Sequence, residues 1–324
     1  MRPIATWLVV GGLAVLGLFA ARDALRSAPA PASSARTTSS IEKRRHRPPV
    51  IATPPQLGDK DRLAAEIQAL GAGGILYVTD ATCHRYLLGL PALVWTTAQT
   101  PPGTDCLSRA PPVVNELSGL TAKQVGAETI EVSSEIWSHR FPGISPAFKP
   151  GGTLTFVRAG RLFEWTTACS RGTAAVTFRG LRTIERCPRP IRGAPRLMQE
   201  VVWTAEHDFA AIAGPPGAMS LLVHRNGREV SLFTAVGASL SGLVASPHGR
   251  YFGARVGGSM VVFDSCRPGN LALPSGAERS NEVAWSPDDR FTALASESFV
   301  YLYPSARPRR AVALPLSAIQ LDWR

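Results

Sequence analysis

Short apolar runs, separated by turns rich in Gly, Pro, Asn and Asp, follow one another from residue 73 to the end of the chain. The clearest unit has four such runs, at 282–286, 291–296, 299–303 and 311–314. The unit before it has a similar layout, at 242–246, 251–256, 260–264, 266–270 and 271–274. Runs of this length, bounded by turn residues, predict β-strands. We therefore expect an all-β body.

One phrase occurs twice in this body, 40 residues apart. Val-Ala-Ser-Pro-His-Gly-Arg-Tyr-Phe at 244–252 is echoed by Ala-Trp-Ser-Pro-Asp-Asp-Arg-Phe-Thr at 284–292. Each copy places a Ser-Pro turn between an apolar strand and an Arg-aromatic pair that opens the next strand. A period near 40 with four strands per unit is typical of a β-propeller blade.

The end of the first strand in each unit is an aromatic or small residue. Trp203, Ala245 and Trp285 occupy this position at intervals of 42 and 40 residues, Phe148 lies 55 before Trp203, and Trp323 lies 38 after Trp285. The Trp203 unit also contains runs at 209–213, 220–224 and 230–234, with an Asn-Gly hairpin turn at 226–227. These intervals predict one recurring packing position per blade.

The two ends of the body complement each other. The run at 74–78 opens it without a preceding first strand, and the run at 319–323 is a first strand without a blade after it. Pairing these two runs would close the propeller and leave no open sheet edge. Counting from there gives about six four-stranded blades. The irregular 110–145 region, strand-like at 124–134, leaves five or seven open.

The turns Ser-Pro-His-Gly-Arg at 246–250 and Ser-Pro-Asp-Asp-Arg at 286–290 resemble the Ser-Pro-Asp-Gly-(Arg/Lys) turn of TolB-type and WD-like bacterial β-propeller repeats. The resemblance is clear in two units, over 242–314, and degraded in two or three others. It implies the propeller fold but no particular ligand, since propellers include scaffolds, receptors and hydrolases. The Gly-His and Trp-Asp signatures of eukaryotic WD repeats are absent, so their partner-binding residues are not carried over.

The N-terminus has a different composition. Residues 4–21 form an uncharged apolar stretch of 18 residues, which predicts a transmembrane signal anchor over 1–26. A cleaved signal peptide is the alternative, because Ala28-Pro29-Ala30 fits a cleavage site. Residues 27–57, rich in Pro, Ser and Ala with basic residues at 43–47, predict a disordered stalk. The propeller is expected over 58–324.

A short helix precedes the first strand of the body. Leu63, Ile67 and Leu70 recur at helical spacing, Asp59 is a candidate N-cap, and Gly71 is a candidate C-terminal glycine. Its apolar stripe is narrow, which favours packing on the propeller edge over binding a partner.

The net charge of +11 is concentrated at the N-terminus, where residues 1–60 carry nine Lys/Arg and three Asp/Glu. The rest of the sequence has no linear basic stripe interleaved with aromatics, so we expect no nucleic-acid partner.

The orientation in the membrane can be judged from the charges that flank the apolar stretch. Basic residues after this stretch favour a cytoplasmic body. The cysteines and the short N-terminal stub favour the opposite orientation. We expect a single-pass protein of the cell membrane with an extracytoplasmic body.

The sequence has five cysteines, four of which could form two disulfides and so indicate an oxidising compartment. Cys83 and Cys106 are 23 residues apart, and Cys169 and Cys187 are 18 apart, each pair within one expected blade. Disulfides at these separations would stabilise by about 3 kcal/mol each. The alternative is that they are buried small hydrophobes. Cys266 would remain free or pair with another molecule.

No hydrolase, P-loop or dinucleotide motif is present, and no Cys/His spacing suits zinc. Asp288-Asp289 and Glu206-His207-Asp208 could ligate a cation, but their repeat position indicates blade turns. We assign no catalytic, cofactor or metal residue and expect a non-catalytic binding or scaffold module for a protein, peptide or cell-wall ligand. One alternative is an extracytoplasmic hydrolase or lyase with ionisable residues at the propeller axis. Another is a cytoplasmic sensor with reduced cysteines.

Overall fold

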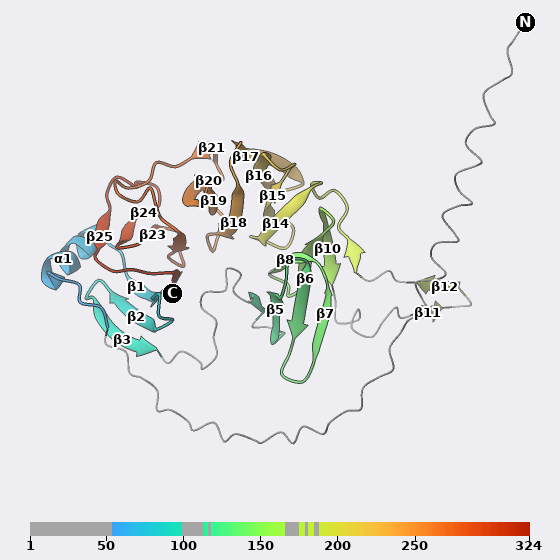
Figure 1. Cartoon of the computed structure of the whole chain (residues 1–324), viewed down its shortest axis with the longest axis horizontal. Helices are drawn as coiled ribbons and strands as arrows, with labels where there is room; N and C mark the ends of the chain where they lie inside the picture. Colours follow the sequence, from blue (N-terminus) through green and yellow to red (C-terminus); the bar gives the residue numbers. More distant parts are fainter. Residues whose placement is uncertain (1–53, 99–112, 116–117, 166–174, 179–180, 185–187) are drawn as a thin grey trace, which may run out of the picture. The chain divides into compact units, whose positions relative to one another are not determined.

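The computed structural model describes residues 54–98, 113–115, 118–165, 175–178, 181–184 and 188–324. In these residues the chain forms six four-stranded antiparallel sheets, a two-stranded ribbon and one helix, α1 (Lys60–Leu70). Within each sheet, neighbouring strands follow each other in the chain, except where β26 pairs with β1 and where β13 pairs with β10 (Figure 1). The predicted all-β body of about six four-stranded units is therefore confirmed.

The first half of the body supplies three of these sheets. One sheet contains β1 (Gly74–Thr79), β2 (Arg85–Leu90), β3 (Val94–Ala98) and, from the far end of the chain, β26 (Gln320–Trp323). The next contains β4 (Val113–Asn115), β5 (Leu120–Gln124), β6 (Thr129–Ser133) and β7 (Ser138–Pro142). The third contains β8 (Ile144–Phe148), β9 (Leu154–Arg158), β10 (Arg161–Trp165) and β13 (Arg189–Pro190). The ribbon, β11 (Ala175–Phe178) and β12 (Leu181–Ile184), lies between β10 and β13 in the chain.

The second half supplies the other three sheets, each from consecutive strands. The first of them contains β14 (Met198–Trp203), β15 (Phe209–Ala213), β16 (Ala218–Arg225) and β17 (Arg228–Val236). The second contains β18 (Leu240–Ala245), β19 (Tyr251–Val256), β20 (Ser259–Asp264) and β21 (Arg267–Asn270). The third contains β22 (Glu282–Trp285), β23 (Phe291–Ala295), β24 (Val300–Pro304) and β25 (Val312–Leu314).

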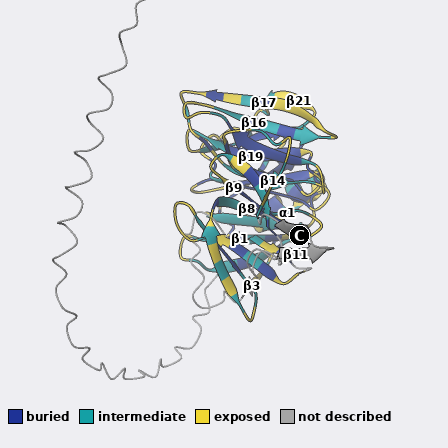
Figure 2. Cartoon of the chain, turned by 90° about the vertical axis from the view of Figure 1, so that its right-hand side faces the viewer, coloured by how far each residue is buried: buried dark blue, intermediate teal, exposed yellow. Residues whose placement is uncertain are grey.

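Five hydrophobic clusters join neighbouring sheets, from the β4 sheet through the β8, β14, β18 and β22 sheets to the β1 sheet. The cluster around Tyr251 and Trp285, for example, joins the β18 sheet to the β22 sheet. Second strands supply much of this core, and every residue of β15 and of β23 is buried. Outer strands such as β17 and β21 carry mostly exposed residues (Figure 2). Each sheet thus depends on its neighbours to bury its apolar faces, as in other repeat architectures.

The predicted pairing between the two ends of the body is confirmed. β26 runs antiparallel to β1, with Leu76 opposite Trp323 and Thr79 opposite Gln320. Two backbone hydrogen bonds between Ile75 and Arg324, of 2.7 and 2.9 Å, extend the ladder by one residue. The C-terminus accordingly lies beside β1 (Figure 1). The last strand of the chain is therefore the first strand of the sheet that begins the body.

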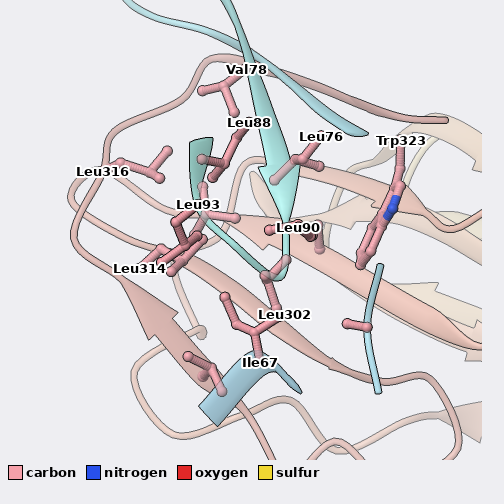
Figure 3. Close-up of a cluster of buried hydrophobic side chains, with 14 of the residues drawn as sticks. Ile67, Leu76, Val78, Leu88, Leu90, Leu93, Leu302, Leu314, Leu316 and Trp323 are labelled. Atoms are coloured by element: carbon pink, nitrogen blue, oxygen red, sulfur yellow. The ribbon is translucent and has the colours of Figure 1, made fainter. Parts of the chain in front are cut away.

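The predicted helix is also confirmed, including both of its ends. The Asp59 carboxylate accepts a hydrogen bond from the Arg62 amide, and Gly71 adopts a left-handed conformation with φ 77°. Leu63 and Ile67 are buried in the cluster that contains Leu302 and Trp323 (Figure 3). The helix packs on the edge of the body, as its narrow apolar stripe indicated.

Two details of the strand pattern differ from the sequence-based expectation. The run expected at 124–134 is two strands, β5 and β6, because a turn at 125–128 closes with a hydrogen bond from the Val125 amide to the Thr129 carbonyl. The run at 271–274 forms no strand, although the Leu271 amide still donates to the Val262 carbonyl. Apolar residues alone did not distinguish these cases, since a turn and a coil can each bury them.

The irregular 110–145 region contains a complete sheet, β4 to β7. The end of its first strand is Asn115, a buried polar residue whose carboxamide accepts a hydrogen bond from the Ser118 amide. This position is aromatic or small in the other units, so the repeat is hard to see in the sequence.

No helix among the described residues is long and apolar enough to cross a membrane. The predicted anchor at 1–26 lies outside the described residues, as does the predicted stalk at 27–57 except for its last four residues. Both therefore stay predictions.

Candidate binding surface

The two copies of the repeated turn use their serine in the same way. The Ser246 hydroxyl oxygen accepts a hydrogen bond of 3.0 Å from the Tyr251 amide, and the Ser286 hydroxyl oxygen accepts one of 2.9 Å from the Phe291 amide. Each serine therefore holds its own turn against the first residue of the next strand. The hydroxyl protons go to different acceptors, Asp289 for Ser246 and Asp288 for Ser286.

Asp289 links the two turns to each other. Its carboxylate accepts a hydrogen bond of 2.7 Å from the Ser246 hydroxyl and is 3.2 Å from the His248 amide. The side chain is 7% exposed and its backbone is left-handed, with φ 60°. A left-handed conformation costs about 1 kcal/mol or more for a residue other than Gly. The links to the neighbouring turn offset this cost.

Gly249 occupies the equivalent position in the first copy and is also left-handed, with φ 67°. A Cβ atom there would lie 2.5 Å from the Cβ of Thr204, which follows β14 in the preceding sheet. The space that Asp289 uses at one interface is thus filled by a neighbour at the other. This explains why the turn reads Gly in one copy and Asp in the next.

The arginines of the repeated turn lie over the aromatic residues that follow them. The Arg250 guanidinium is 5.2 Å from the centre of the Tyr251 ring, and the Arg290 guanidinium is 5.6 Å from that of Phe291. Loose ion pairs connect Arg250 to Asp264 at 3.7 Å and Arg290 to Asp288 at 3.8 Å. Both arginines remain exposed and available to a ligand.

A cavity of about 510 Å³ lies between the turn at 286–290, the carboxyl end of α1 and the loop after β24. Arg250 and Arg290 line it together with Arg307 and Arg310 of that loop. Its apolar wall includes Leu70. The cavity is within the size range of ligand sites in proteins.

A second cavity of about 470 Å³ adjoins the first and shares two wall residues with it, His248 and Arg250. Arg225, at the end of β16, lines this cavity and donates a hydrogen bond of 2.9 Å to the Gly249 carbonyl. We call the two adjacent cavities together the basic groove, defined by Arg225, His248, Arg250, Arg290, Arg307 and Arg310.

Three carboxylates also line the groove, and each is bound by the fold. Asp289 accepts hydrogen bonds from the neighbouring turn, and Asp208 accepts one of 3.0 Å from the Asn226 amide. Asp288 accepts one of 2.6 Å from the Ser286 hydroxyl, which is the main reason that its pKa is lowered. The groove contains five guanidinium groups and only three carboxylates, each already hydrogen-bonded within the fold, so its net charge is positive.

At the other end of the first strands, polar side chains connect neighbouring sheets. The Ser145 hydroxyl accepts a hydrogen bond from the Val201 amide, and the Glu200 carboxylate accepts bonds of 2.9 and 2.7 Å from the Gly242 and Leu243 amides. These bonds occur at β-bulges, where the backbone of Ser145 and Gly242 is left-handed. The side chains hold the bulges of adjacent first strands in register.

Glu282 belongs to the same set of inter-sheet contacts. It pairs with Arg255, whose guanidinium also donates to the Asn281 carbonyl at 2.8 Å. Burial raises the pKa of the Glu282 carboxyl, and Arg255 lowers it by a smaller amount. The carboxylates Glu200 and Glu282 are therefore both engaged by residues of neighbouring sheets.

The acidic residues considered as cation ligands in the sequence lie in turns of the structure. Asp288 and Asp289 lie in a turn between strands, as does Glu206, whose carboxylate accepts a hydrogen bond from the Gly151 amide. The described part of the chain contains no group of three or more side chains that could hold a metal ion.

The predicted disulfide residues are mostly outside the described part of the chain. Cys83 lies within it, has φ 68° and is disulfide-bonded. Cys106, Cys169 and Cys187 lie outside the described residues, so the pairing of Cys83 with Cys106 and of Cys169 with Cys187 stays a prediction. Cys266 is free and exposed, and it lines the second cavity of the basic groove.

Six four-stranded antiparallel sheets in chain order, one of them closed by the last strand of the chain, decide the architecture. The described part of the chain is a six-bladed β-propeller. Among solved structures, TolB from Acinetobacter baumannii is similar with a TM-score of 0.46 and 14% identity over 78% of this chain and 66% of that one. A protein from Lactobacillus plantarum is similar with a TM-score of 0.47 and 9% identity over 78% of this chain and 99% of that one. The propeller thus spans just under two thirds of the TolB chain that it matches.

Comparison of the chain with protein-family models and with curated protein sequences finds no match. The sequence does not predict the basic groove, because the arginines that line it come from four separate segments of the chain. The repeated Arg of the turn, at 250 and 290, was the only signal in the sequence that pointed toward it.

Proposed function

We propose that the protein is a membrane-anchored, extracytoplasmic β-propeller that acts as a non-catalytic binding or scaffold module for a protein, peptide or cell-wall ligand. A single-pass anchor at 1–26 and a stalk at 27–57 hold the propeller away from the membrane. The fold supports a binding role, since propellers present broad surfaces on a rigid frame.

One observation carries the proposal: the basic groove is a hollow on the surface, and two of its arginines, Arg307 and Arg310, are exposed and form no ion pair with the described residues. Arg307 and Arg310 project from a loop whose own backbone hydrogen bonds, from the Arg307 amide to the Pro304 carbonyl and from the Arg310 amide to the Arg307 carbonyl, already stabilise it. Loops on a rigid scaffold are the usual location of binding residues. By contrast, the polar groups on the first strands are used to join sheets.

Site-specific photo-crosslinking in cells tests this role. A photoreactive residue at Ala306, which lines the groove, is expected to give one discrete crosslinked species with the full-length chain. The same residue at Val236, which is 81% exposed on β17, is the control and should give none. Absence of any species from Ala306, or the same species from both positions, would refute a binding role for this surface.

A further inference from the structure

Positive charge exceeds negative charge in the basic groove, which is lined by five guanidinium groups and three carboxylates. Among the described residues, the guanidinium groups of Arg307 and Arg310 have no ion-pair partner within the 4.0 Å that defines one, and both side chains are exposed. Arg250 and Arg290 have only the loose pairs described above. Like charges held close together repel, and water and salt weaken but do not remove this repulsion. A ligand with negative charge would relieve it.

Three features of the groove disfavour a compact phosphate group as that ligand. Phosphate sites commonly use free backbone N–H groups at turns or at the amino end of a helix. Here the His248 and Arg290 amides already donate to Asp289 and Asp288. The end of α1 at the groove, Ala69 and Leu70, is the carboxyl end, which offers no free backbone N–H groups to a phosphate. The donors that remain are separate guanidinium groups.

The walls between these guanidinium groups are partly apolar. Leu70, Phe291, Tyr251 and Pro304 line the first cavity, and the second extends it toward Arg225. Arg and Tyr beside apolar pockets are the usual composition of strong protein-binding positions. Guanidinium groups pair with carboxylates in a bidentate geometry. Two adjacent cavities with spaced cations and partly apolar walls fit a chain that carries both carboxylates and apolar side chains.

We infer that the basic groove binds an acidic peptide segment of a protein partner, in which Asp or Glu carboxylates pair with Arg250, Arg290, Arg307 and Arg310. The inference rests on the proposed function and names the chemistry of its ligand. Apolar residues of the same segment pack against the wall formed by Leu70 and Pro304. The charges of the groove and of the peptide are complementary, which speeds association and makes binding sensitive to salt.

Fluorescence polarisation with the full-length chain tests this inference. The probe is a fluorescein-labelled peptide of alternating Glu and Leu, and the comparison probes are its Lys–Leu counterpart and an oligothymidylate single strand. The variant R307Q/R310Q removes two groove charges, and R279Q/R309Q removes two exposed arginines that do not line the groove. R309Q is a close match because Arg309 lies in the same loop. Thermal unfolding verifies that both variants are folded.

The acidic peptide is expected to bind saturably, with affinity about tenfold weaker in R307Q/R310Q and within about twofold of the parent in R279Q/R309Q, since Arg residues in pockets often dominate binding. Equal weakening in both variants would overturn the inference, because it would indicate net charge alone. No binding of the acidic peptide, equal binding of the Lys–Leu peptide, or tighter binding of the oligothymidylate would overturn it as well. A crosslinked partner at Ala306 in any of these cases would leave the proposed function standing.

Discussion

The Asp289 carboxylate accepts a 2.7 Å hydrogen bond from the Ser246 hydroxyl, which lies 43 residues earlier in the preceding blade. Both side chains are buried, so each satisfies a polar group that the other would leave unpaired. The bond joins the two best-preserved copies of the repeated turn. It also positions His248 at the wall shared by the two cavities of the groove.

A double-mutant cycle of Ser246→Ala and Asp289→Gly measures this link. Asp289→Gly keeps a residue suited to φ 60° and removes the acceptor, so the buried Ser246 hydroxyl loses its partner. We expect each single variant to lower the free energy of unfolding by about 1–2 kcal/mol. The double variant should lose about 1 kcal/mol less than the sum, because the second change removes a bond already broken. Additive losses in denaturant titrations would show that the link contributes nothing.

The glycine in the first copy of the turn gives a separate prediction. Gly249→Ala places a Cβ atom against Thr204 and adds the strain of φ 67°. Gly237→Ala is the matched control, since Gly237 has φ 70° with nothing within 4 Å of the added atom. The control is expected to cost about 1 kcal/mol from backbone strain alone, and Gly249→Ala about 1–3 kcal/mol more from overpacking. The difference in denaturation midpoint measures the clash, and equal midpoints would contradict it.

The repeat phase was predictable from the sequence because one physical constraint recurs. Phe148, Trp203, Ala245, Trp285 and Trp323 each end the first strand of their sheet, where the side chain packs on a neighbouring sheet. The Trp203 indole, for example, donates a 2.7 Å hydrogen bond to Thr155 of the preceding blade. Asn115 occupies the same position without the aromatic signal, so its blade was not recognised.

The basic groove could not be predicted in the same way. Arg225, Arg290 and Arg310 are separated by many residues, and only the packing of successive blades brings them to one hollow. A basic site of this kind does not form a continuous stretch in the sequence, so a linear basic stripe is absent even though the folded surface is basic. Residues 61–324 have a small net charge because their acidic residues nearly equal their basic residues in number, and some of these form ion pairs, such as Arg255 with Glu282.

Deletion of residues 319–324 tests the closure of the propeller. The deletion removes β26, exposes the edge of β1, and removes the indole of Trp323, which is 4% exposed and donates to the Gly73 carbonyl at 3.0 Å. We expect a large loss of stability across the whole body. Trp323→Ala, which keeps the strand, should cost about 3–5 kcal/mol. Hydrogen exchange is the measurement: if faster exchange stayed within β1 to β3, the closure would be only local.

Glu282 gives a prediction for pH dependence. Burial raises its pKa in the folded state above the unfolded value, so its contribution to stability is largest when the carboxyl is protonated. That contribution is lost as the pH rises through the folded pKa. Glu282→Gln stays neutral and can still accept a hydrogen bond from Arg255. The variant should therefore gain stability relative to the parent between pH 4 and pH 7, by up to about 1 kcal/mol. A difference in urea midpoint that is independent of pH would contradict this cause.

The state of the cysteines tests the proposed location of the body. Cys266 is free and exposed, and the four other cysteines are predicted to pair as Cys83 with Cys106 and Cys169 with Cys187. Disulfides persist in oxidising compartments and are rare in the cytosol. Thiol titration of the denatured, unreduced full-length chain is therefore expected to find one reactive thiol per molecule, and the Cys266→Ser variant none. Five thiols in the parent chain would contradict both disulfides and the extracytoplasmic location. Mass spectrometry of unreduced tryptic peptides would then identify which pairs form if only one thiol is found.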